Sequence, residues 1–89
     1  MTDSPKDLCA YIVDKGRCNG SGTSKYVRNK LNDSRVTAVV EKTWTAGGER
    51  KSKRDSYRLD PDGEEFVGCT EDITHTVFFD YKVVGCTKL

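Results

Sequence analysis

Residues 35–59, RVTAVVEKTWTAGGERKSKRDSYRL, decide the fold that we expect for this chain of 89 residues. In the first half of this stretch apolar and polar side chains alternate, which is the period of a half-buried β-strand. One parity carries Val36, Ala38, Val40 and Trp44, interrupted by Lys42, and the other carries Thr37, Glu41, Thr43 and Thr45. Threonine, valine and tryptophan favour a pleated surface over a helix. We therefore predict a strand over residues 35–45.

A turn and a returning strand follow directly. The sequence Ala46-Gly47-Gly48-Glu49 contains the paired glycines that tight hairpin turns favour. Residues 52–59 then place Tyr57 and Leu59 on one face and Arg54 and Arg58 on the other. This pattern predicts a β-hairpin over residues 35–59 with a basic outer face.

The rest of the chain also has the pattern of short strands. We predict them at residues 8–13, 24–29, 64–70 and 74–86. Residues 14–22 contain three glycines and are predicted to form a loop, and Asp60-Pro61-Asp62-Gly63 is a strong turn signal. The absence of a helical stripe excludes parallel α/β folds, which need crossover helices. About six to seven strands predict one small antiparallel domain over residues 1–89, with residues 1–7 as a flexible segment.

This arrangement predicts a core and one irregularity. The side chains expected in the core are Val36, Ala38, Val40, Trp44, Tyr57, Leu59, Val77, Phe79, Tyr81 and Val83. In a regular strand Cys86 would point away from Phe79 and Tyr81. A β-bulge at Gly85 would reverse the alternation and turn Cys86 inward.

Four cysteines in so short a chain indicate a disulfide framework: Cys9, Cys18, Cys69 and Cys86. Their spacing lacks the short ligand pairs of structural zinc sites, so no metal is predicted. Local pairing and pairing of Cys9 with Cys86 both stay open, as do four reduced, buried thiols. Met1-Thr2-Asp3-Ser4 lacks the apolar segment of a signal peptide, which fits a cytosolic protein or a mature chain with an added methionine. The cysteines favour the second, and we expect an extracytoplasmic location.

Three segments together resemble bacterial immunoglobulin-like modules over residues 24–88. Residues 26–29 and 34–40 (YVRN and SRVTAVV) are similar to the second and third strands of those modules. Residues 59–65 (LDPDGEE) resemble the turn before their fifth strand, and residues 81–85 (YKVVG) resemble their closing strand. The chain departs from the pattern where Asp62 separates Pro61 from Gly63, and in the segment that carries Cys9 and Cys18. The resemblance implies an immunoglobulin-like β-sandwich and a secreted or cell-envelope binding module, and it carries over no functional residue. The cysteine count adds the expectation that one or two disulfides stabilise this sandwich.

The residues that could carry catalysis are few. His75 is the only histidine, and no strained Gly-x-Ser-x-Gly turn accompanies it. The paired carboxylates, such as Asp60 and Asp62, fall in turns, and they fit turn chemistry better than a calcium loop. We therefore expect no enzyme, no catalytic residue and no cofactor.

A basic cluster on the hairpin is the best candidate for a binding surface: Arg50, Lys51, Lys53, Arg54 and Arg58. We expect it to contact a protein or a surface glycan. The balance of 15 Lys+Arg against 14 Asp+Glu argues against nucleic acid, and no apolar run approaches the roughly 20 residues that cross a bilayer. Two alternatives stay open. One is a small intracellular nucleic-acid-binding barrel that uses the same hairpin, and the other is a secreted inhibitor or toxin that acts through residues 15–23.

Overall fold

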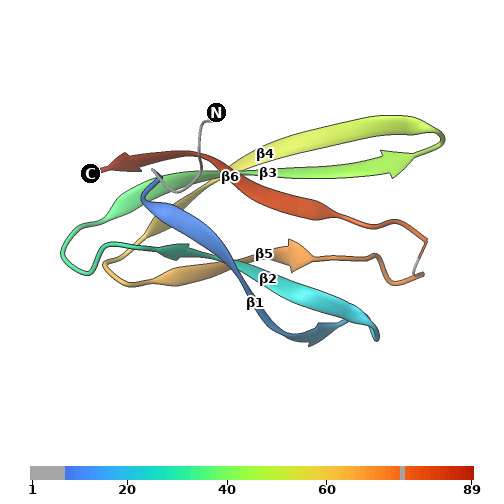
Figure 1. The fold of residues 1–89 in the computed structure, drawn as a ribbon, viewed down its shortest axis with the longest axis horizontal. Helices are drawn as coiled ribbons and strands as arrows, with labels where there is room; N and C mark the ends of the chain where they lie inside the picture. Colours follow the sequence, from blue (N-terminus) through green and yellow to red (C-terminus); the bar gives the residue numbers. More distant parts are fainter. Residues whose placement is uncertain (1–7, 75) are drawn as a thin grey trace.

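The chain pairs into antiparallel strands that form two sheets, as the computed structural model of residues 8–74 and 76–89 shows (Figure 1). The predicted flexible segment 1–7 and His75 lie outside the described residues. Within the described part the strands are β1 (Ala10–Cys18), β2 (Gly22–Asn29), β3 (Val36–Ala46), β4 (Glu49–Leu59), β5 (Glu64–Cys69) and β6 (Asp80–Lys88). No helix occurs in these two ranges, so the all-β prediction is confirmed.

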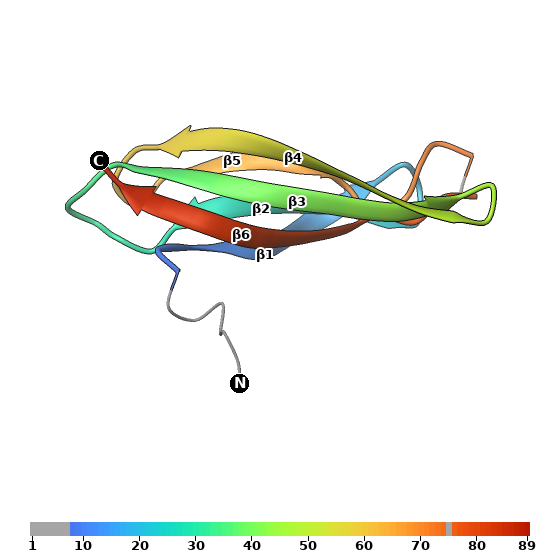
Figure 2. The same cartoon turned by 90° about the horizontal axis from the view of Figure 1, so that it is seen from above.

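Each sheet has three strands within the described residues, in the orders β1-β2-β5 and β4-β3-β6. Figure 1 shows the second sheet above the first, and Figure 2 shows the same strands from above. The sheets share one apolar core, to which Ala10 and Val27 contribute from one side and Val36, Ala38 and Val40 from the other. The outer strands β1, β5, β4 and β6 each have one edge without a partner strand in this topology.

The predicted hairpin is confirmed. β3 and β4 pair without a register shift from Val36 opposite Leu59 to Ala46 opposite Glu49. Gly47 and Gly48 form the turn with φ angles of 59° and 80°, a conformation that favours glycine and matches the twist of the strands. The hairpin reaches past the ends of β5 and β2 in Figure 1, so its tip extends beyond the shared core.

Two predicted strands have bounds that differ most from those of the structure. β1 continues to Cys18, and residues 14–18 pair with β2 where a loop was predicted. The side chains of this extension are polar, which suits a strand that is exposed to solvent. Asp14 on β1 forms an ion pair of 2.5 Å with Lys25 on β2. β6 begins only at Asp80, because the Asp72 carboxylate accepts hydrogen bonds from the Thr76 and Val77 backbone N–H groups and folds that segment into a loop.

A bulge in β6 turns Cys86 inward, as the sequence predicts. Val39 lies opposite Gly85 and Val40 lies opposite Val83, so Val84 is the extra residue. The bulge places Val83 and Cys86 on the same face, although their numbers differ in parity. Cys86 can therefore bond with Cys9 between the sheets.

The core is smaller than predicted. Its buried apolar side chains, among the described residues, are Ala10, Val27, Val36, Ala38, Val40, Leu59 and Val83. Five of these were predicted. The other five predicted core residues are only half-buried: Trp44, Tyr57, Val77, Phe79 and Tyr81. They lie on the hairpin, on β6 or on the segment before β6, towards the margin of the volume that both sheets enclose.

Disulfides compensate for the small core. Cys9, just before β1, bonds with Cys86 on β6, with 5.6 Å between the Cα atoms and 77 residues between them in sequence. Cys18, at the end of β1, bonds with Cys69 on β5 across a separation of 51 residues. A disulfide that closes a loop of either length stabilises the folded state by about 4 kcal/mol when only the entropy of the unfolded chain is considered. This pairing selects the option that joins Cys9 to Cys86 and excludes both local pairs.

Gly22 is the position at which the Cys18–Cys69 bond passes over β2. A Cβ atom on Gly22 would lie 2.7 Å from the Cys69 Sγ and 2.9 Å from the Cys18 carbonyl oxygen. We expect Gly22→Ala to lower the free energy of unfolding by about 1–3 kcal/mol, because neither neighbour is the free end of a flexible chain. Urea denaturation of the oxidised protein measures this loss.

Gly85→Ala is the matched control for that variant. A Cβ there would lie 3.7 Å from Val39, an ordinary contact, so the loss of stability stays below that of Gly22→Ala. Equal stability of the two variants would contradict the steric account of Gly22.

Candidate functional site

The five cations of the predicted site all lie on β4, and all are exposed: Arg50, Lys51, Lys53, Arg54 and Arg58. They do not share one face, as a single basic outer face would require. Leu59 points into the core, and the unbroken alternation of β4 places Lys51 and Lys53 on the same side of the strand as Leu59. Arg50, Arg54 and Arg58 lie on the opposite side. The strand therefore carries positive charge on both of its faces.

Carboxylates on β3 and β6 accompany the arginines of the outer face. Arg54 Nε lies 3.3 Å from Glu41 Oε2, and Arg50 Nη2 lies 3.8 Å from Asp80 Oδ2. Glu41 also pairs with Lys82 at 3.8 Å. The cations of these pairs are mostly exposed, although Glu41 is only 17% exposed, and ion pairs with solvated cations contribute little to stability. They do fix the positions of the two guanidinium groups along the strand.

The inner face of the hairpin holds a cation among aromatic rings. The Lys42 ammonium lies 4.2 Å from the centre of the Phe79 ring and 5.7 Å from that of Trp44. Trp44 and Phe79 pack edge to face, with centroids 5.7 Å apart and planes at 62°. Such cation–π contacts contribute about 0.5–2 kcal/mol. Trp44 and Phe79 are thus engaged with each other and with Lys42.

A hollow of about 340 Å³ lies beside this cluster, between the sheets. Its lining includes Lys42, Phe79, Tyr81 and the Cys18–Cys69 bond. The Tyr81 hydroxyl donates a hydrogen bond of 2.8 Å to the Cys69 carbonyl and so joins β6 to β5. Gly68 makes this crossing possible, because a Cβ there would lie 2.8 Å from the Tyr81 Cζ. Burial, with a smaller effect of the Tyr57 charge, raises the pKa of Tyr81 to about 12.

The segment before β6 is held by two carboxylates. Asp72 accepts hydrogen bonds from Thr74, Thr76 and Val77, which lower its pKa to about 2. Glu71 is buried and accepts a 2.6 Å hydrogen bond from the Ser21 hydroxyl.

The same contacts bear on the alternative site at residues 15–23. The turn at its tip is bound to the body of the protein, because the Asn19 side-chain amide also donates to the Glu71 carbonyl at 2.8 Å. A turn fixed in this way offers little adaptable surface.

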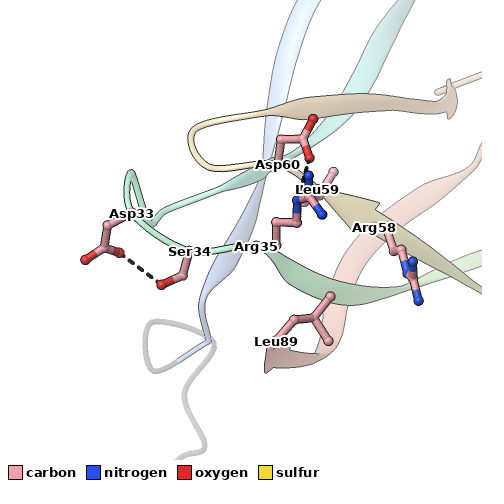
Figure 3. Close-up of a pocket in the computed structure, with 7 residues that line it drawn as sticks. All are labelled: Asp33, Ser34, Arg35, Arg58, Leu59, Asp60 and Leu89. Atoms are coloured by element: carbon pink, nitrogen blue, oxygen red, sulfur yellow. Dashed lines mark hydrogen bonds and ion pairs between the residues drawn. The ribbon is translucent and has the colours of Figure 1, made fainter.

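A larger hollow, of about 830 Å³, lies at the other end of the molecule (Figure 3). Its walls come from the β2–β3 connection, the end of β4 and the last residue: Asp33, Ser34, Arg35, Arg58, Leu59, Asp60 and Leu89. Arg35 Nε and Asp60 Oδ1 pair across it at 3.2 Å. The only residue of this set that the sequence predicts to bind a partner is Arg58. The three segments lie far apart in the chain, so no local pattern could have brought them together.

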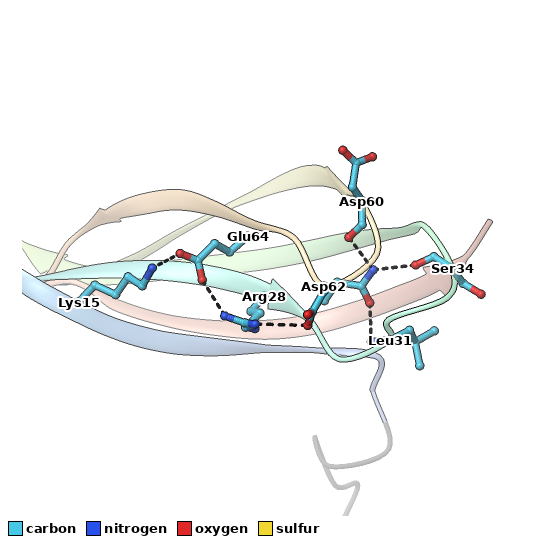
Figure 4. Close-up of polar contacts among 8 residues, drawn as sticks. Lys15, Arg28, Leu31, Ser34, Asp60, Asp62 and Glu64 are labelled. Carbon is cyan, nitrogen blue, oxygen red and sulfur yellow. Dashed lines mark hydrogen bonds and ion pairs between the residues drawn. The ribbon is translucent and has the colours of Figure 1, made fainter.

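Asn29 organises the same end of the molecule. It is fully buried, and its side-chain nitrogen donates to the Ser34 carbonyl at 2.8 Å and to the Asp60 carbonyl at 3.0 Å. Its side-chain oxygen accepts from the Leu31 N–H at 2.8 Å. Figure 4 shows these partners converging from two connections. One buried amide thus fixes the β2–β3 connection against the turn after β4.

The outer face of the first sheet carries a chain of ion pairs, also drawn in Figure 4. Glu64 pairs with Lys15 and, at 3.3 Å, with Arg28, and Arg28 also pairs with Asp62 at 3.2 Å. Lys15 first and Arg28 second lower the pKa of Glu64, against the effect of desolvation. This network was missed because its members lie on three strands and in the turn before β5, and the sequence did not reveal the register that brings them together.

A row of one aliphatic and two aromatic side chains lies beside that network. Val13, Tyr26 and Phe66 face one another across β1, β2 and β5, and Tyr26 packs edge to face on Phe66. Phe66 is 51% exposed. The row gives the outer face of the first sheet an apolar strip. The cations beside the strip, Lys15 and Arg28, form ion pairs with Glu64 and Asp62.

The described residues contain no group of three or more histidine, cysteine or acidic side chains that could hold a metal ion. His75, the only histidine, lies outside them. No helix in the part of the chain that the structure describes is long and apolar enough to cross a membrane. Comparison with protein-family models, with curated proteins and with solved structures finds no match to this chain.

Tyr81 leads to a prediction about alkaline pH. Its pKa is raised from 10 to about 12, so its neutral form stabilises the fold fully below pH 10 and this contribution is lost as the pH rises through 12. We expect a phenolate absorbance titration to show one tyrosine with a midpoint at about 12. Tyr81→Phe should remove that step, whereas Tyr11→Phe should keep it. Persistence of the step in Tyr81→Phe would contradict the assignment.

Proposed function

We propose that this domain is a non-catalytic binding module of a secreted or cell-envelope protein, with its contact surface on the hairpin of residues 35–59. The observation that carries the proposal is the exposure of β4. Every residue from Glu49 to Ser56 is exposed, and the strand holds five cations. Most of this strand therefore adds nothing to the small apolar core. Charged, adaptable side chains on a rigid sheet are a common form of recognition surface.

The strand order supports an immunoglobulin-like sandwich for this module. The pairs β1–β2, β2–β5 and β3–β6 correspond to the pairs A–B, B–E and C–F of immunoglobulin domains. β4 then takes the place of strand C′, beside β3. The disulfides differ from the B–F bridge of antibody domains, because Cys9 and Cys18 flank β1. A module of this class presents its partners with strand faces and loops, since it has no deep central cavity.

The disulfides also support an extracytoplasmic setting. Such bonds form and persist in oxidising compartments, and small secreted domains use them where the core is insufficient. Both conditions fit a chain whose four cysteines are all paired and whose core is small.

The test is a paired binding screen. The protein is applied to arrays of surface glycans and extracellular proteins beside the variant Arg54→Glu/Arg58→Glu. We expect the variant to lose the binding seen with the parent, because two contact cations are reversed. Its free energy of unfolding should change by less than about 1 kcal/mol, as for other exposed ion pairs.

A matched control separates local contact from overall charge. Arg17→Glu/Lys88→Glu makes the same change in net charge on β1 and β6 and should bind like the parent. Unaltered binding by the hairpin variant, or the absence of any bound ligand on either array, would overturn the proposal.

A further inference from the structure

We propose that the partner is an extended polyanion, namely a sulfated or phosphate-bearing polysaccharide, which lies along the open edge of β4 and is contacted from both faces of the strand. This inference rests on the proposed function and specifies its ligand.

The edge position of β4 gives the proposal its geometry. β4 is the outer strand of the order β4-β3-β6, so a ligand can approach its free edge directly. Arg50 and Arg54 extend from one face and Lys51 and Lys53 from the other. A compact ligand on one face would reach only half of these charges. A chain that follows the edge lies within reach of both sets.

The spacing of the cations matches a linear ligand. Successive residues of an antiparallel strand are about 3.4 Å apart, which separates Lys51 from Lys53 by about 7 Å and Arg50 from Arg54 by about 14 Å. The set extends over about 27 Å from Arg50 to Arg58 on the same basis. Negative groups repeated along a polymer can meet several of these cations at once, and the resulting multivalency does not need a deep pocket.

The charge of this segment favours an anion. Between Glu49 and Arg58 five cations accompany two carboxylates, those of Glu49 and Asp55, which leaves a net charge of 5 − 2 = +3. Three of the cations form exposed ion pairs that an anionic ligand must compete with: Arg54 with Glu41, Arg50 with Asp80 and Lys51 with Glu49. Lys53 and Arg58 make no ion pair with any residue that the structure describes, so their charges are available to a ligand. Short segments rich in lysine and arginine are the usual electrostatic footprint for polyanions.

The aromatic rings decide between a glycan and a nucleic acid. Proteins that bind single strands combine cations with ring faces on which bases stack. Here Trp44 and Phe79 pack on each other, and Lys42 covers the Phe79 ring. The outer face of β3 and β4 instead carries hydroxyl groups between the arginines, from Thr37, Thr43, Thr45, Ser52 and Ser56. Hydroxyl groups and cations suit sulfate, phosphate and sugar oxygens.

The experiment measures binding of heparin and of dextran sulfate by calorimetry from 50 to 200 mM NaCl, with uncharged dextran as the reference. With three or four ionic contacts the association constant should fall about a hundredfold over this range. Two variants remove charge from one face each: Lys51→Gln/Lys53→Gln and Arg50→Gln/Arg54→Gln. Each should weaken binding at least about fivefold and reduce the salt dependence, because each removes two of the contacts.

Arg17→Gln/Lys88→Gln loses the same net charge elsewhere and should stay within about twofold of the parent. Loss of affinity in only one of the two β4 variants would overturn the edge geometry in favour of binding on one face. Tighter binding of a single-stranded oligonucleotide than of either sulfated glycan would replace the glycan by a nucleic acid. If no polyanion binds while the array screen yields a ligand that depends on Arg54 and Arg58, this inference fails and the proposed function stands.

Discussion

Strand β1 is fastened at both ends, and the rest of the structure depends on this constraint. The bond from Cys9 to Cys86 ties its start to the opposite sheet, and the bond from Cys18 to Cys69 ties its end to β5, across β2. The apolar core alone is small for a domain of this length, because chains of this size bury a modest fraction of their surface. The two disulfides add stability because they restrict the unfolded chain. The Tyr81–Cys69 hydrogen bond and the hydrogen bonds of the buried Asn29 amide also hold the two sheets together.

Because the disulfides and the core hold the two sheets together, most of β4 can remain exposed for contact with a partner. Burial is concentrated where the sheets overlap, and the hairpin extends beyond it with cations on both faces (Figure 1). Lysine and arginine on an edge strand also discourage pairing with other sheets, since they keep the open ladder of backbone groups solvated. The same residues therefore protect the edge from aggregation and leave it accessible to an anionic chain. These two roles do not conflict, because neither requires the side chains to be buried.

The sequence predicts the parts of this structure that local chemistry controls. Alternation over Val36, Ala38 and Val40 and the glycine pair at 47–48 determine the hairpin, and Gly85 marks the bulge that turns Cys86 inward. The extension of β1 was missed because its residues are polar and gain their strand form from pairing with β2. The Arg35–Asp60 hollow and the two-faced placement of the cations depend on how distant segments meet, which periodicity in one strand cannot reveal.

The most direct test of this account is a disulfide map of the unreduced protein by tryptic digestion and mass spectrometry. Each cysteine falls in its own tryptic peptide: residues 7–15, 18–25, 59–82 and 83–88. The account predicts that 7–15 is linked to 83–88 and that 18–25 is linked to 59–82. A link between 7–15 and 18–25 would contradict it, because an extended β1 holds Cys9 and Cys18 about 30 Å apart and a disulfide requires less than about 7 Å between Cα atoms.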